Sequence, residues 1–204
     1  TAFSQTLQHA EILSRPTDKS VTALCFFQQN AEVCAQYGTV SGQLNQQTPW
    51  KNVPGGAGAE IVLENLQANT RYFYRICHRT PGTANFTTRP ERNFHTQRPA
   101  GTAFTFVIQA DPHLDERSDT ALYRRCLDNQ LADRPDFMVD LGDIFMSDKL
   151  KNTQNRITRD TVLYRVKYMR RYYESVNHSV PLFMVLGNHE GEAGWTLNQT
   201  AENV

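Results

Sequence analysis

The second half of the sequence contains three apolar, β-rich runs, and each run leads directly into a short polar segment. The runs are residues 104–108, 137–139 and 181–186. Because helical stretches separate them, we expect them to be parallel strands of one sheet, joined by right-handed crossovers. The carboxyl ends of such strands open onto one edge, where α/β folds bind their ligands. This pattern predicts a layered α/β domain for the second half.

The polar segments bring two Asp, two His and one Asn to that predicted edge. They are Asp111-Pro112-His113, Gly142-Asp143 and Gly187-Asn188-His189-Glu190. Carboxylate and amide oxygens mixed with imidazole suit a divalent metal ion, or a pair of them. The sequence therefore predicts a metal-dependent catalytic site.

Two helices are expected between these strands. Ser118 or Asp119 can cap the first helix, and Arg134-Pro135 ends it. Its apolar residues have helical spacing; they are Leu122, Cys126, Leu127 and Leu131. For the second helix we expect a buried face of Val162, Val166 and Met169, with Tyr164, Tyr168 and Tyr172 beside it.

The first half, up to about residue 98, has a different sequence pattern. Its short β-like runs alternate with turn-rich gaps, and no helical period competes with them. These features predict an antiparallel β-sandwich. A linker is expected around Arg98–Thr102, where the pattern changes.

One segment of this half sharpens the prediction. Residues 66–72, Leu-Gln-Ala-Asn-Thr-Arg-Tyr, resemble the segment that enters a late strand of fibronectin type III domains, with Ala68 in place of the usual Pro. In such sandwiches the Tyr hydroxyl bonds back to the backbone as a tyrosine corner, which makes Tyr72 the candidate. The alternative is an ordinary strand aromatic.

Bulk properties exclude several classes of protein. The chain has 204 residues, and 21 basic residues balance 21 acidic ones. No basic field favours nucleic acid as a bulk partner, and no apolar stretch approaches the roughly 20 residues of a membrane span. The four cysteines include no CxxC pair, which argues against a thiolate zinc site.

The three motifs in order resemble the N-terminal half of the calcineurin-like metallophosphoesterases, and the preceding half is similar to the sandwich of purple acid phosphatases. The resemblance covers essentially the whole chain. It implies a fibronectin type III-like β-sandwich at 1–98, followed at 103–204 by the first half of a layered α/β/β/α domain. It also implies a secreted, periplasmic or cell-surface protein.

The resemblance assigns roles to individual residues. Asp111 and His113 would bind the first metal, Asp143 would bridge two metals, and Asn188 would bind the second. His189 would be catalytic and not a ligand; it would approach the phosphate and either stabilise the transition state or protonate the leaving oxygen. Two divalent or mixed-valence ions (Fe, Zn or Mn) would generate a bridging hydroxide as nucleophile and clamp the phosphoester substrate. A positioned imidazole adds about 10²–10⁴-fold by acid catalysis.

Two departures from the family pattern matter. Met146 stands where purple acid phosphatases have Tyr, so the colour of a Tyr–iron bond is not expected. The family also has a Gly-His-x-His segment well downstream of its last motif here, and this chain ends at Val204. We therefore expect a missing C-terminal half, supplied in cis or as a second chain.

Several other residues have open interpretations. Asp140 is expected to be structural, and Glu190 either orients the His189 loop or is solvated. Arg170 and Arg171 are interpreted as a solvated helix face, His178 as exposed, and His95 as a partly buried strand residue. Cys34 and Cys77 are expected to point away from the sandwich core on neighbouring strands, where they either form a disulfide or remain free thiols.

The leading functional hypothesis is a dinuclear metallophosphoesterase. Within it, monoesters and diesters or nucleotides are alternative substrates of the same site. The hypothesis from another class is a non-catalytic surface or assembly module with a vestigial phosphoesterase half.

Overall fold

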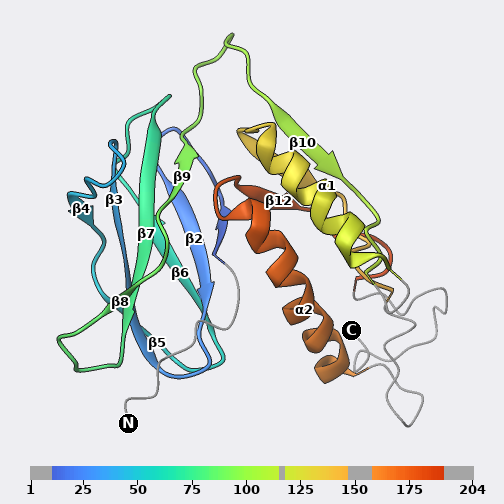
Figure 1. Ribbon diagram of the computed structural model, residues 1–204, viewed down its shortest axis with the longest axis horizontal. Coiled ribbons are helices and arrows are strands. Elements are labelled where there is room, and N and C mark those ends of the chain that lie inside the picture. The colour runs from blue at the N-terminus through green and yellow to red at the C-terminus, as the bar shows by residue number, and fades with distance from the viewer. Residues whose placement is uncertain (1–10, 115–117, 147–157, 191–204) are drawn as a thin grey trace.

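The computed structural model describes residues 11–114, 118–146 and 158–190. Its first half consists of strands alone and its second half alternates strands with helices (Figure 1). No described helix is long and apolar enough to cross a membrane.

The first half is a β-sandwich, as predicted. Its nine strands are β1 (Ile12–Ser14), β2 (Val21–Phe26), β3 (Ala31–Gly38), β4 (Gln46–Gln47), β5 (Lys51–Val53), β6 (Gly58–Leu63), β7 (Arg71–Arg79), β8 (Thr87–Thr88) and β9 (Arg92–His95). One layer contains β1, β2 and β6, and the other is built on the antiparallel pair of β3 and β7. Alternate residues of both layers, among them Leu63, Tyr74 and Ile76, are buried in one core.

Tyr72 makes the predicted tyrosine corner. Its hydroxyl accepts a hydrogen bond from the main-chain N–H of Gln67 at 2.9 Å, and its ring is buried. The hydroxyl thus satisfies a main-chain donor five residues upstream, which holds the turn that precedes β7.

Cys34 and Cys77 lie directly opposite each other on β3 and β7. Both are free thiols. Val33, Ala35 and Ile76, which neighbour the two cysteines along these strands, belong to the sandwich core, whereas the cysteines do not. Both cysteines are nevertheless buried.

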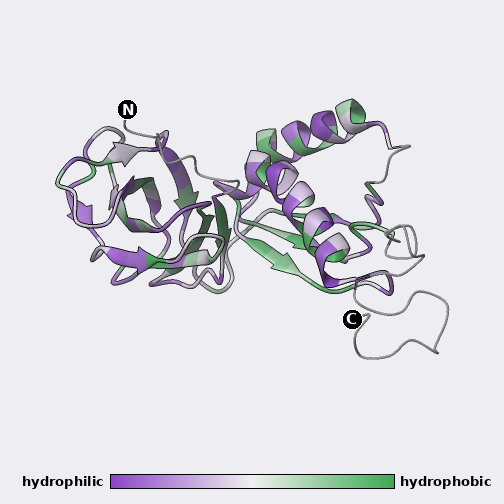
Figure 2. Ribbon diagram, turned by 90° about the horizontal axis from the view of Figure 1, so that it is seen from below, coloured by the Kyte–Doolittle hydropathy of each residue, from purple (hydrophilic) through white to green (hydrophobic). Residues whose placement is uncertain are grey.

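The second half has the predicted β-α-β-α-β order. Its elements are β10 (Phe106–Gln109), α1 (Thr120–Ala132), β11 (Phe137–Asp140), α2 (Arg159–Asn177) and β12 (Leu182–Met184). The three strands are parallel and adjacent, in the order β10-β11-β12. Both crossovers place their helix on the same side of the sheet (Figure 2).

A single sheet runs through both halves. β1 pairs in parallel with β12, through Ser14 and Leu182, and pairs antiparallel with β2. The six-stranded order is therefore β10-β11-β12-β1-β2-β6. The sequence did not predict β1, because its three residues are too few to show a pattern and its partner lies far away in the chain.

Helix α1 begins where predicted but packs with a different face. Asp119 caps it by accepting from the N–H groups of Ala121 and Leu122, both at 3.0 Å. Leu127 is buried and Leu131 is half-buried, whereas Leu122 and Cys126 are exposed. Tyr123 takes the place expected for Leu122, since residues 123, 127 and 131 share one stripe at a spacing of four.

Helix α2 packs as predicted along most of its length. Met169 and Tyr172 are buried, while Val162 and Val166 are half-buried against the same core. Tyr164 remains exposed. The buried face continues to Tyr173 and Val176, which the sequence prediction did not include.

Arg170 and Arg171 do not form the solvated face that we expected. The guanidinium carbon of Arg170 lies 3.5 Å from the ring centroid of Phe26 in the sandwich, and that of Arg171 lies 3.9 Å from the ring of Tyr168. A guanidinium is weakly hydrated and stacks readily on aromatic faces. The pair therefore contributes to packing, and Arg170 connects α2 to β2.

Polar contacts also join the two halves. The Tyr74 hydroxyl donates to the main-chain carbonyl of His178 at 2.7 Å. Arg89 donates to Glu11 at 3.0 Å and to Glu174 on α2 at 2.8 Å. The prediction that His178 is exposed is wrong: it is half-buried, and burial lowers its pKa to about 4. His95 is partly buried in β9, as expected.

The face of the β10–β12 strands opposite the helices is apolar and exposed. Phe106, Ile108 and Phe183 are 45%, 56% and 44% exposed, respectively. Phe104, Phe106 and Phe137 stack on one another, with ring centroids 5.3–5.9 Å apart. A groove of about 600 Å³ lies beside this face, against the segment that leads out of the sandwich. No described helix or strand lies over this face of the β10–β12 sheet (Figure 2).

Candidate metal centre

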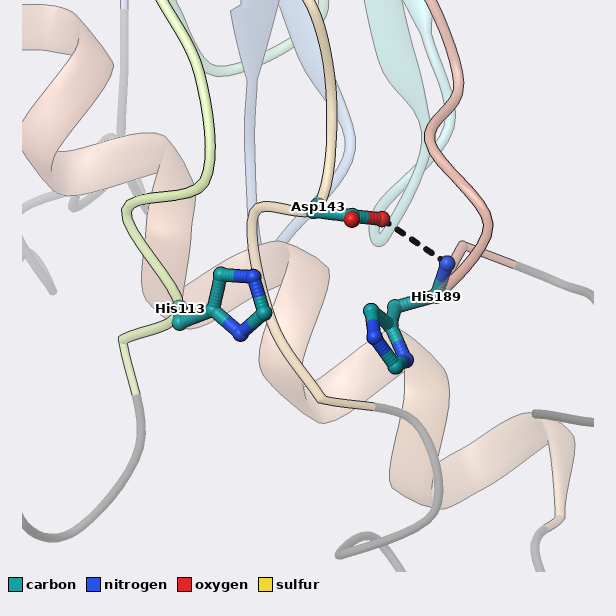
Figure 3. A group of neighbouring side chains, drawn as sticks. All are labelled: His113, Asp143 and His189. Atoms are coloured by element: carbon teal, nitrogen blue, oxygen red, sulfur yellow. Dashed lines mark hydrogen bonds between the residues drawn. The ribbon is translucent and has the colours of Figure 1, made fainter. Parts of the chain in front are cut away.

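The three polar segments converge at one edge of the sheet. His113 follows β10, Asp143 follows β11 and His189 follows β12, and their side chains face one another (Figure 3). One ligand atom from each lies within 4.8 Å of the others. This is the arrangement expected for parallel strands whose carboxyl ends share an edge.

The other two candidate ligands lie on the same loops. The Asp111 carboxylate contacts His113 Nε2 at 3.1 Å and is largely exposed. Asn188 is exposed in the turn that carries His189. The structure therefore brings Asp111, His113 and Asp143 to one edge, with Asn188 beside them. It also brings the His189 imidazole within ligand range of the cluster, while the predicted catalytic role of His189 stays a prediction.

A short main-chain ladder joins the first loop to the second. The N–H groups of Asp111, His113 and Leu114 donate to the carbonyls of Gly142, Asp143 and Ile144, at 3.0, 3.3 and 3.2 Å. These main-chain bonds continue beyond the ends of β10 and β11, and they fix the two loops relative to each other.

Three candidate ligands have left-handed backbone conformations. Their φ angles are +54° for Asp111, +40° for His113 and +53° for Asp143. Non-glycine residues seldom adopt this region, and each such position costs about 1–3 kcal/mol. Backbone strain of this kind concentrates at functional sites, where the surrounding structure maintains it.

Two glycines allow the second and third loops to touch. Gly142 has a φ of +89°, and a Cβ added there would collide with the main-chain nitrogen of Gly187. A Cβ added at Gly187 would collide with the Asp143 carboxylate. The glycines of both motifs are therefore required by close approach of the backbones.

Glu190 and Asp143 connect these two loops through side chains. Glu190 accepts hydrogen bonds from the N–H groups of Asp143 and Gly187, both at 2.7 Å, and of Ile144 at 2.6 Å. In return, Asp143 Oδ1 accepts from the His189 N–H at 2.9 Å. Of the two interpretations left open by the sequence, loop orientation is correct for Glu190.

Asp140 is structural, as predicted. It is fully buried, and its carboxylate accepts from the Gly142 N–H at 2.8 Å and from the Tyr173 hydroxyl at 2.6 Å. Burial and the neighbouring Asp140 raise the pKa of Tyr173, so this phenol stays a donor. Tyr173 extends the stripe of Val166 and Met169, and that spacing was the available signal for it.

The donor set fits a transition-metal ion. The cluster contains one carboxylate and two imidazoles. A second carboxylate, that of Asp111, contacts the His113 imidazole. Imidazole with carboxylate suits zinc, iron or manganese. Three protein donors are the number found in many catalytic zinc sites, where water or substrate occupies the remaining position.

Comparisons with known proteins show what this chain resembles in sequence and in fold. The sequence profile of the calcineurin-like phosphoesterase family matches residues 104–203. The solved structure of PhoD matches with a TM-score of 0.69 and 15% identity, covering 100% of this chain and 44% of that one. The present chain therefore spans less than half the length of PhoD and shares its fold. No curated protein matches the sequence.

Matches to the first half alone are distant. A fibronectin type III domain from human fibronectin type III domain containing protein 3 gives a TM-score of 0.35 at 11% identity, covering 50% of this chain and 94% of that one. The sensor domain of the anti-sigma factor RsgI4 from Pseudobacteroides cellulosolvens gives 0.36 at 10% identity, covering 48% and 100%. The fibronectin-like character of the sandwich, and the predicted boundaries at 98 and 103, stay predictions.

Proposed function

Since residues 104–203 are a partial calcineurin-like phosphoesterase domain, we propose that the protein is a metal-dependent phosphoester hydrolase with a dinuclear centre. The observation that carries the proposal is the meeting of His113, Asp143 and His189 at three strand ends. The fold alone would not carry it, because function belongs to sites and not to folds.

Each residue has a proposed part. Asp111 and His113 would hold one ion, Asp143 would lie between the two, and Asn188 would hold the second through its amide oxygen. When bound, two such ions supply a nucleophile at neutral pH and neutralise charge on the phosphoryl oxygens. His189, which is only 4% exposed, would contact the phosphate and donate a proton to the leaving oxygen.

Further polypeptide would complete this site, either in cis or as a second chain. The proposed second ion needs ligands beyond Asp143 and Asn188, and no described element covers the exposed face of Phe106, Ile108 and Phe183. Parallel sheets of α/β proteins are normally covered on both faces. One additional layer packed on that face would satisfy both needs.

The test uses the intact protein, its bound metal content and hydrolysis of an aryl phosphate. We expect Asp143→Asn to lose metal and to lower kcat/KM by at least about 10²-fold, because a carboxylate ligand is removed. Asp128→Asn, on the exposed side of α1, is the matched control and should change neither. Full activity in Asp143→Asn would contradict the proposal.

A second experiment separates the alternatives. An intact protein that binds no metal under any condition would favour the surface or assembly module. Comparing an aryl phosphate with a bis-aryl phosphate would distinguish a monoesterase from a diesterase.

A further inference from the structure

The Glu190 carboxylate is surrounded by main-chain donors from two different motif loops. Oε2 accepts from the N–H groups of Asp143 and Gly187, and Oε1 accepts from that of Ile144. All three bonds measure 2.6–2.7 Å. Hydrogen bonds to an ionised acceptor are shorter and roughly twice as strong as neutral ones.

These bonds leave Glu190 poorly suited to bind metal itself. A carboxylate offers about four acceptor positions, and both oxygens already face N–H groups. The cluster of described side chains that could hold a metal ion contains His113, Asp143 and His189 and does not include Glu190. Its carboxylate therefore faces the backbone behind the site.

The backbone that Glu190 holds is the part that orients the candidate ligands. Asp143 has a strained φ of +53°, and its own N–H is one of the three donors. The Asp143 carboxylate in turn accepts from the His189 N–H. Glu190 and Asp143 thus link the second and third loops in both directions, so a change in one link moves both side chains.

We propose that Glu190 is a positioning residue, which holds the loops of Asp143 and His189 at the separation needed for metal binding. This inference rests on the proposed function. It predicts that removing the charge, with the shape kept, will loosen the loops before any metal or substrate is present.

Glu190→Gln is the appropriate variant, because a glutamine amide would turn its NH₂ toward at least one main-chain N–H. In the metal-free intact protein, we expect the amides of Asp143, Ile144 and Gly187 to exchange with deuterium about 10–100-fold faster. In a Mn²⁺ titration, we expect affinity to fall by about 10–100-fold. Glu64→Gln, an exposed glutamate of the sandwich, is the matched control and should change neither measurement.

Protection of the Met138 amide, which donates to the Pro181 carbonyl at 2.9 Å, reports whether the α/β half of the variant has folded. Should Glu190→Gln not fold, Glu190→Asp keeps the charge but withdraws it by one methylene, and the same accelerated exchange is expected. Unchanged exchange of the three amides in a folded variant would overturn the proposal, even if Mn²⁺ affinity fell, because Glu190 would then be a ligand.

Failure of this inference is distinguishable from failure of the proposed function. If Asp143→Asn abolishes Mn²⁺ binding while Glu190→Gln leaves Mn²⁺ affinity within about twofold, the metal site stands and the positioning role is wrong. If neither variant affects metal binding, the proposed function fails as well.

Discussion

The sandwich and the α/β half reach their structures by different means. The sandwich buries apolar residues from both of its layers in one shared core. The α/β sheet buries one face under two helices and exposes large apolar residues on the other. At the end of that sheet, order depends on glycines, strained backbone and hydrogen-bonded carboxylates. The described sandwich thus packs its two layers against each other, whereas the α/β sheet packs one face only and carries the candidate site at its edge.

The largest expected effect separates two glycines with similar backbone conformations. Gly142 (φ +89°) touches Gly187, whereas Gly56 (φ +79°) in the sandwich has open space around its missing Cβ. We expect Gly142→Ala to lower the free energy of unfolding by about 4 kcal/mol or more, because backbone must move. Gly56→Ala should cost about 1 kcal/mol, for the left-handed conformation alone. Urea unfolding measures both, and equal losses would break the contrast.

The second effect compares two isoleucines. Ile76 is fully buried in the sandwich, while Ile108 lies on the exposed sheet face. In the 204-residue chain, Ile76→Ala should cost about 3 kcal/mol through lost burial and a cavity. Ile108→Ser should cost no more than about 0.5 kcal/mol. The same pair measured in a protein that contains the proposed additional layer sharpens the comparison, since a large loss for Ile108→Ser there would show that the face is covered.

The smallest effect concerns the boundary between the halves, where burial lowers the pKa of His178 to about 4. An unfolded histidine titrates near 6.5, so the unfolded chain takes up the proton first as pH falls. The stabilisation is present above pH 6.5 and disappears between about 6.5 and 4. We expect it to be about 2 kcal/mol, after allowing for partial exposure. His178→Gln should flatten the dependence of unfolding free energy on pH in this window; an unchanged slope would assign it to another group.

Much of the fold was predictable because the two halves have different sequence patterns. Short β-like runs between turn-rich gaps predicted the sandwich strands, helical spacing predicted α1 and α2, and the position of Asp119 predicted the start of α1. The face of α1 was partly wrong, because Leu122 and Tyr123 belong to adjacent stripes and only tertiary contacts choose between them. The three residues of β1 carry no local pattern, so the sheet shared by both halves could not be predicted.

The convergence of the candidate residues was predictable, whereas the hydrogen bonds that support their loops were not. Strand ends placed Asp111, His113, Asp143 and His189 at one edge, and residue chemistry indicated metal. The sequence does not predict which carboxylates hold the loops, because their hydrogen-bond donors are main-chain N–H groups, which every residue except Pro possesses. The sequence therefore allows two interpretations of Glu190, and the three hydrogen bonds to its carboxylate decide between them.

The strand that both halves share has a practical consequence for dividing the gene. A clone that starts near residue 103 would omit β1, the neighbour to which β12 pairs on its outer side. The strand that leads to His189 would then be an unpaired edge strand, and such strands promote aggregation by pairing with other chains. The α/β half should be expressed with its sandwich attached.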